Sequence, residues 1–123
     1  MLFRSTKDGS TNAMPGSNIP MAALGAWILW LGWFGFNGGS ELVVSSESNA
    51  IAVSQVFLNT NMAASGGVVG ALVIGLIRSG KLDVTMAING AIAGLVAITA
   101  GPNSPTAGEA TLLGFIEIGR AHV

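Results

Sequence analysis

Long stretches without a charged side chain dominate this sequence. Three such runs cover residues 20–40, 48–77 and 84–108, and a fourth opens after Glu109. A helix rises ~1.5 Å per residue and needs ~20 apolar residues to cross a bilayer. Only 9% of the residues are charged, against about 25% in average soluble domains, so a soluble bundle would lack its polar shell. The sequence therefore predicts an all-α membrane protein, a polytopic bundle of transmembrane helices.

The ends of the expected helices are indicated by capping residues and by glycine and proline. Ser17 or Asn18 can cap a first helix that has Pro20 in its first turn, where a missing N–H costs nothing. Glycines at 38–39 are typical of residues that follow a helix, and the segment GPNSP stops the third helix. We expect helices over about 19–37, 49–77, 84–100 and 107–116, the last one truncated.

Both termini have the character of foreign sequence. Back-translation of EIGRAHV at 117–123 gives a common sequencing-adapter string, and the reverse complement of that string encodes Leu-Phe-Arg-Ser, as at residues 2–5. We therefore expect residues 1–5 and 117–123 to be adapter-derived tails, and residues 6–116 to be part of a longer transmembrane domain. His122, the single histidine, falls in such a tail and is left out of the functional argument.

The few charged residues predict how the helices are oriented. With alternate crossings, Lys7 shares one side with the turn at 78–83, which holds Arg78 and Lys81, and three glutamates, Glu41, Glu47 and Glu109, share the other. Lys and Arg are retained on the cytoplasmic side of membranes. We expect a multi-pass protein of the plasma or inner cell membrane, with loops 6–18 and 78–83 cytoplasmic and loops 41–48 and 101–106 external.

The composition also argues against several function classes. The chain has no cysteine, and its net charge is −1, which gives no electrostatic basis for binding nucleic acid. The first three expected helices contain no carboxylate, lysine or histidine, so they supply no general acid or base. We expect no enzyme activity, no cofactor and no metal site, and a soluble helical enzyme is disfavoured by the scarcity of charge.

Glycines and polar residues inside the spans predict how the helices pack. Three glycine pairs are spaced four residues apart, which lets neighbouring helices approach closely: Gly35/Gly39, Gly66/Gly70 and Gly90/Gly94. Polar side chains are costly when they face lipid, and for most of them we expect hydrogen bonds between helices. They are Gln55, Asn59, Thr60, Asn61, Ser65, Thr85, Asn89 and Thr99.

Three segments resemble consecutive helices of one membrane-protein family. NIPMAALGAWILWLGWFGFNGGS is similar to the sixth transmembrane helix of ammonium transporters of the Amt/MEP branch, VFLNTNMAASGG to the seventh, and NGAIAGLVAITAG to the eighth. The resemblance implies a fold of eleven helices when complete, built as two inverted halves and assembled as a homotrimer in the lipid bilayer. It also implies transport of ammonium or ammonia, with methylammonium as an analogue, through a hydrophobic pore.

The same resemblance implies roles for four residues. Phe36, the second phenylalanine of GWFGF, matches a gate phenylalanine, and Ser40 matches the hydroxyl that helps to hold the cation at the outer site. Trp33 matches a tryptophan that lines the pore, and Thr99 a threonine close to the paired pore histidines. Those histidines, the other gate phenylalanine and a structurally important aspartate belong to family helices that do not match this chain.

Two other functions are open on the sequence alone. Some members of the family couple ammonium binding to a cytoplasmic signalling domain, so an ammonium-sensing receptor is one alternative. The other is a small, non-conducting membrane protein with a structural role, which requires natural termini. We expect the segment to be a fragment of a transporter.

Overall fold

The computed structural model describes residues 2–5, 11–14 and 16–120, and in these it contains four helices in one bundle. This bundle confirms the expected helical membrane-protein class, and two short antiparallel strands precede the helices. The elements are β1 (Leu2–Ser5), β2 (Thr11–Met14), α1 (Ile19–Gly39), α2 (Glu47–Ser79), α3 (Val84–Ile98) and α4 (Ala107–Arg120).

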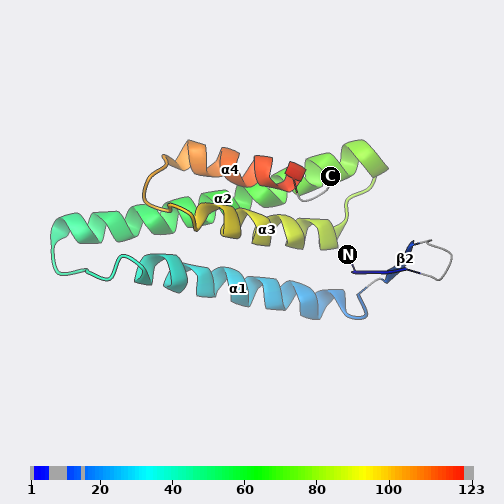
Figure 1. The fold of residues 1–123 in the computed structure, drawn as a ribbon, viewed down its shortest axis with the longest axis horizontal. Coiled ribbons are helices and arrows are strands. Elements are labelled where there is room, and N and C mark those ends of the chain that lie inside the picture. Colours follow the sequence, from blue (N-terminus) through cyan, green and yellow to red (C-terminus); the bar gives the residue numbers. More distant parts are fainter. Residues whose placement is uncertain (1, 6–10, 15, 121–123) are drawn as a thin grey trace.

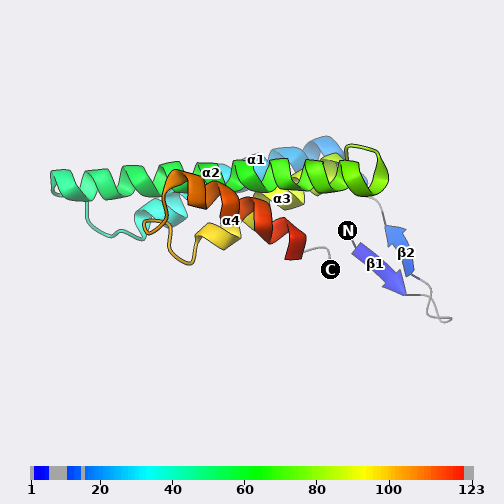
Figure 2. The same cartoon turned by 90° about the horizontal axis from the view of Figure 1, so that it is seen from above.

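Successive helices run in opposite directions along the bundle (Figure 1). The chain turns at one end between α1 and α2 and again between α3 and α4, and at the opposite end between α2 and α3. The long helix α2 packs against α1, α3 and α4, as the view from above also shows (Figure 2). By length and composition, α1 and α2 are both able to cross a membrane.

Several element bounds correct the sequence-based expectation. The hydroxyl of Ser46 accepts the N–H of Asn49, so α2 starts before residue 49. Gly80 adopts a left-handed conformation with φ 66° and ends α2 after Ser79 instead of at 77. The Thr99 N–H bonds the carbonyl of Val96, which tightens the last turn and ends α3 at Ile98 instead of 100.

The remaining corrections concern α1, α4 and the first loop. α1 continues to Gly39 instead of 37, because the Ser40 N–H still bonds carbonyls of its last turn. α4 continues beyond 116 to Arg120, through a stretch expected to be a tail. The expected loop 6–18 was wrong over Thr11–Met14, where the backbone pairs with β1 in the register Leu2 to Met14. Lys7 and His122 lie outside the described residues, and a foreign origin of the tails stays a prediction.

Glycines set the spacing of α2, α3 and α4. A Cβ on Gly67 would overlap the backbone of Gly90, and one on Gly94 would overlap the backbone of Ala63. On the other side of α2, Gly66 and Gly70 lie against the backbone of α4 at Thr111 and Phe115. Close approach is thereby confirmed for the pairs Gly66/Gly70 and Gly90/Gly94. The expected pair Gly35/Gly39 on α1 faces open space in this structure.

Among the polar side chains predicted to bond between helices, Thr60 and Thr99 each bond a residue of α1. Asn37 on α1 donates to the Thr60 hydroxyl on α2 over 3.0 Å. Asn59, also on α2, bonds carbonyls of the loop between α3 and α4. Ser65 instead donates to the Asn61 carbonyl of its own helix.

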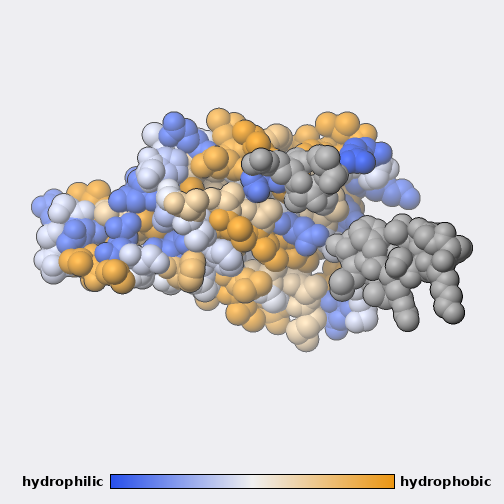
Figure 3. Space-filling view, viewed as in Figure 1, coloured by the Kyte–Doolittle hydropathy of each residue, from blue (hydrophilic) through white to orange (hydrophobic). Residues whose placement is uncertain are grey.

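The surface is apolar over much of the bundle. In the space-filling view hydrophobic residues gather over the middle of the molecule, and hydrophilic ones are more frequent toward the end where α1 turns into α2 (Figure 3). Many large apolar side chains are exposed on α1, among them Trp27 (67%) and Leu31 (72%). Such a surface suits contact with lipid or with further helices, not with water.

Candidate functional site

A groove between α1 and α3 contains three of the four residues singled out from the sequence. Its volume is about 540 Å³. Trp33 and Phe36 approach it from α1, and Thr99 approaches it from the end of α3. The groove is lined by Ile28, Leu29, Gly32, Trp33, Phe36, Val96 and Thr99.

Trp33 and Thr99 meet directly across the groove. The indole Nε1–H donates to the Thr99 hydroxyl over 2.9 Å, and that hydroxyl donates to the Leu95 carbonyl over 2.8 Å. Both polar hydrogens are therefore directed along this relay instead of into the groove. What Trp33 presents to an occupant is its aromatic surface, and what joins α1 to α3 here is a hydrogen bond between side chains far apart in sequence.

Phe36 lies one helical turn from Trp33, on the same face of α1. The two ring centroids are 5.9 Å apart, and the ring planes are tilted by 58°. Phe36 is 61% exposed, so the ring is accessible from outside the described bundle. A pair of tilted aromatic rings at the side of a groove offers π faces that attract cations.

Ser40 lies beyond the groove, where α1 ends. Its hydroxyl donates to the Phe36 carbonyl over 2.7 Å, and its side chain is exposed. The structure therefore brings Ser40 next to the turn that carries Phe36 but not into the groove lining. Because its hydrogen is used within the helix, the oxygen of Ser40 is left to accept a hydrogen bond from outside.

Four lining residues were not identified from the sequence: Ile28, Leu29, Gly32 and Val96. A signal for them was present, because residues 28, 32 and 36 follow one another at a spacing of four, as do residues 29 and 33. This spacing places them on the helix face of Phe36 and Trp33. Because Gly32 has no side chain, it leaves open space in the groove beside the two large rings of Trp33 and Phe36.

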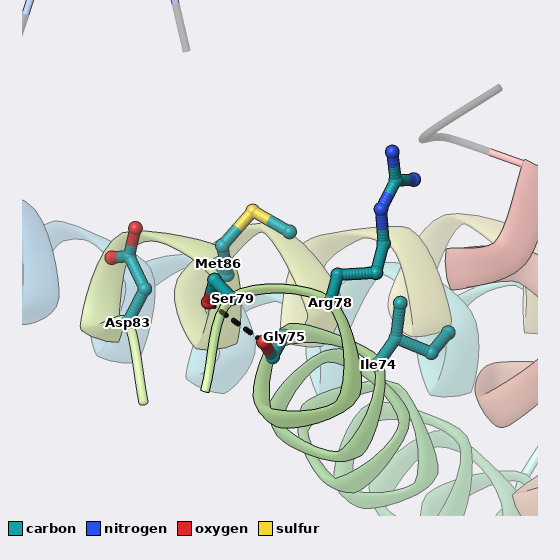
Figure 4. Close-up of a pocket in the computed structure, with 6 residues that line it drawn as sticks. All are labelled: Ile74, Gly75, Arg78, Ser79, Asp83 and Met86. Atoms are coloured by element: carbon teal, nitrogen blue, oxygen red, sulfur yellow. Dashed lines mark hydrogen bonds between the residues drawn. The ribbon is translucent and has the colours of Figure 1, made fainter. Parts of the chain in front are cut away.

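A second pocket lies at the other end of the bundle and is separate from this groove. It has a volume of about 330 Å³ and forms where α2 turns into α3. The side chains of Arg78 and Asp83 lie at its two sides with Met86 between them, and the Ser79 hydroxyl donates to the Gly75 carbonyl over 2.7 Å (Figure 4). Within the described residues, no three histidine, cysteine, aspartate or glutamate side chains gather as metal ligands would.

The sequence of the chain matches a known protein family and several of its members. Residues 3–118 match the Ammonium Transporter Family. The chain is 52% identical over 99 residues to ammonium transporter Amt2 of Archaeoglobus fulgidus, a match that covers 80% of this chain and 20% of that protein. It is 38% identical over 109 residues to Amt1 of Methanocaldococcus jannaschii, covering 89% of this chain and 26% of that protein.

Solved structures show the same arrangement of helices. A protein described as Sensor Amt Protein superposes with a TM-score of 0.86 at 41% identity, covering 95% of this chain and 28% of that one. Mep2 of Candida albicans superposes with a TM-score of 0.76 at 30% identity, covering 83% of this chain and 22% of that one. The chain spans between 20% and 28% of the length of these four relatives. With its sequence and its helix packing both matched, the chain belongs to the ammonium transporter family.

Proposed function

We propose that this chain is part of an integral membrane transporter that moves ammonium or ammonia through a hydrophobic pore. The observation that supports this most is the groove in which Trp33, Phe36 and Thr99 converge. In a member of this family such a groove is one wall of a pathway that other helices of the complete protein would close. We propose the same pathway role for Ser40, at its outer end.

The chemistry of the four side chains suits a small cation that sheds water. An ammonium ion has four N–H donors and no acceptor, so it needs acceptors and π faces. The exposed Phe36 ring and the neighbouring indole can each contribute about 0.5–2 kcal/mol by cation–π attraction. The oxygen of Ser40 can accept one ammonium hydrogen, because its own hydrogen is bound to the Phe36 carbonyl.

Deeper in the groove the walls favour a neutral species. The relay from Trp33 through Thr99 to Leu95 uses both polar hydrogens that the groove residues offer there. The side chains of Ile28, Leu29 and Val96 in the lining are aliphatic, so a charged ion beside them gains little and loses hydration. This arrangement supports capture of ammonium near Ser40 and Phe36, followed by passage of ammonia.

The proposed orientation follows the charges that the structure describes. Arg78 and Lys81 lie at the end where α2 turns into α3, and Ser40 lies at the opposite end with Glu41 and Glu47. By the positive-inside rule, we place Ser40 and Phe36 at the external side of a cell membrane. We further propose that the complete protein is a homotrimer.

A sensing role is a second candidate, and one observation favours it. The structure described as Sensor Amt Protein superposes on 95% of this chain with a TM-score of 0.86. A receptor of this kind would use the same groove to bind ammonium and would add a cytoplasmic signalling domain. The DNA beyond the codons of this chain would discriminate the two, because it does or does not encode such a domain.

Transport is tested in a chimera in which residues 6–116 replace the corresponding segment of Archaeoglobus fulgidus Amt2. Phe36→Ala should weaken methylammonium uptake about 2- to 30-fold, as the loss of one cation–π contact predicts. Ser40→Ala should raise KM about tenfold, since a hydrogen bond to a charged group is lost. Neither change should dissociate the trimer.

Two substitutions serve as matched controls. Ser54→Ala removes a hydroxyl that also donates to a carbonyl four residues earlier, but on α2 and away from the groove. Leu31→Ala removes an exposed apolar side chain of α1 that does not line the groove. Uptake that is unchanged in both Phe36→Ala and Ser40→Ala, or lowered equally in the controls, would contradict the site assignment.

A further inference from the structure

Two neighbouring polar side chains in the first half of α2 are completely buried. Asn59 and Thr60 both have 0% exposure, within a helix that is otherwise largely apolar. Burying an amide or hydroxyl is unfavourable unless its hydrogen bonds are satisfied, and in a bilayer there is no water to satisfy them. The partners of these two residues therefore indicate what they hold in place.

Asn59 fastens the loop that follows α3. Its Nδ2 donates to the Pro102 carbonyl over 2.9 Å and to the Pro105 carbonyl over 2.6 Å. Its Oδ1 accepts from Gln55 Nε2 over 3.2 Å. Both amide hydrogens are thus used on one short segment, in which two prolines already fix φ.

Thr60 fastens the end of α1. Its hydroxyl accepts from Asn37 Nδ2 over 3.0 Å and donates to the Val56 carbonyl over 2.7 Å. Asn37 is itself 2% exposed, so the bond is shielded from competing partners. Asn37 directly follows Phe36 in the helix, and Trp33 lies one turn earlier.

The two fastened segments are the ones that carry the groove residues. Pro102 comes three residues after Thr99, and Asn37 one residue after Phe36. Trp33 Nε1 and the Thr99 hydroxyl join the two sides of the groove by a hydrogen bond of 2.9 Å. A displacement of either segment would therefore separate this pair. We propose that Asn59 and Thr60 are positioning residues: from adjacent places on α2 they fix the ends of α3 and α1, and so set the Trp33–Thr99 contact.

The consequence for transport rests on the proposed function, whereas the positioning itself does not. Neither Asn59 nor Thr60 lines the groove, so each acts through the segments that it holds. Fully satisfied buried networks select one arrangement, since any other leaves donors unpaired in a medium of low dielectric. Substituting Asn59 or Thr60 should therefore alter the geometry of the groove but leave the helix content largely unchanged.

The first test uses the 123-residue chain in detergent micelles. A parent with Trp27→Phe and Trp30→Phe leaves Trp33 as the reporter, because the chain has three tryptophans. Asn59→Leu keeps the branched shape and the number of heavy atoms and removes the amide, and Thr60→Val keeps the shape and removes the hydroxyl. We expect both to shift the Trp33 emission, and Asn59→Leu to accelerate hydrogen exchange at the Gly101 and Ser104 amides about tenfold.

Two further variants separate positioning from general loss of structure. Thr60→Ser keeps the hydroxyl and should restore the parent emission. Ser54→Ala removes a hydroxyl bonded within α2 itself and should leave emission and exchange unchanged. If Asn59→Leu does not fold, Thr60→Val and Thr60→Ser decide the question. Parent-like emission in Thr60→Val, or an equal shift in Ser54→Ala, overturns the proposal.

The second test asks for the consequence in the Amt2 chimera. Asn59→Leu and Thr60→Val should raise KM for methylammonium by about three- to tenfold through the misplaced groove residues, while the trimer is retained and Thr60→Ser transports like the parent. A KM equal to that of the parent in both variants overturns the link to transport. If the unsubstituted chimera takes up no methylammonium, the proposed function fails, and the Trp33 emission still decides the positioning.

Discussion

The four helices fall into two regions that are held together in different ways. In α2, α3 and α4 the backbones nearly touch: Gly67 lies against Gly90, and Gly114 lies against the backbone of Ala63. Along α1, by contrast, only Asn37 and Gly38 are buried, and the sites of Gly32 and Gly35 face open space. One region is packed by shape along its length, and the other is fastened mainly near its end.

The attachment of α1 consists of a few specific contacts. Trp33 bonds Thr99, Asn37 bonds Thr60, and the Gly38 backbone lies against the Phe57 ring. Phe34 meets the same Phe57 ring edge-on at 5.7 Å. The groove is bordered by both regions, so its width depends on how this end of α1 is held.

The largest effect is expected when the same substitution, glycine to alanine, is made in each of the two regions. Gly67→Ala places a methyl group where it overlaps the Gly90 backbone, and overpacking of this kind costs about 1–3 kcal/mol. Gly35→Ala adds the same methyl group in open space and should stabilise α1 by about 0.5–1 kcal/mol through helix propensity. Unfolding of the chain in mixed micelles, followed by circular dichroism, measures both.

The same pair of variants sharpens the comparison in the Amt2 chimera. If Gly35→Ala lowers the stability of the chimera but not of this chain, another helix of the complete protein packs against α1 at that glycine. Equal losses for Gly67→Ala and Gly35→Ala in the chain itself would contradict the division into two regions.

A smaller effect is expected where a polar contact fastens α1. Asn37→Ala removes the donor to Thr60, and the buried hydroxyl loses a partner, which costs about 1–2 kcal/mol. Hydrogen exchange should accelerate in the last turns of α1 and not in α3. Asn61→Ala, at an exposed position of α2, is the control and should change neither. Uniform acceleration across all helices would show that α1 is not a separate region.

Much of this division could be predicted from the sequence because it depends on local pattern. Charge-free runs predicted the helices, and glycines four apart predicted close approach between helices, which the structure shows between α2 and both α3 and α4. Trp33, Phe36 and Thr99 were selected by resemblance, and the structure brings them to one groove. Their role in moving ammonium stays a prediction.

Other features depend on tertiary contacts that a local pattern does not contain. Asn37 precedes two glycines and was read as the end of a helix, yet it is buried against Thr60. The spacing of Gly35 and Gly39 is the same as that of the packed pairs, but a Cβ at either glycine would meet no described atom within 4 Å. The pairing of β1 with β2 arises in a polar segment without clear alternation, so backbone hydrogen bonds decided it.

The smallest expected effect compares a turn inside the three-helix region with the turn that joins α1 to that region. Both contain a left-handed residue: Gly80, with φ 66°, between α2 and α3, and Leu42, with φ 60°, between α1 and α2. A side chain in this conformation costs about 1–2 kcal/mol. Gly80→Ala should therefore destabilise the chain by about 1 kcal/mol, since its Cβ would meet no neighbour and only the backbone term changes.

Leu42→Gly is the reverse exchange at the other turn. Leu42 is 88% exposed, so little packing is lost, and relief of the left-handed strain is partly offset by the greater freedom of glycine in the unfolded chain. A net gain of about 0.5 kcal/mol is expected, measured in the same micelles as Gly80→Ala. A gain for Gly80→Ala together with a loss for Leu42→Gly would mean that these turns do not hold left-handed residues in the membrane. The contrast between three helices packed along their length and an α1 fastened near its end would then be confined to the helices themselves.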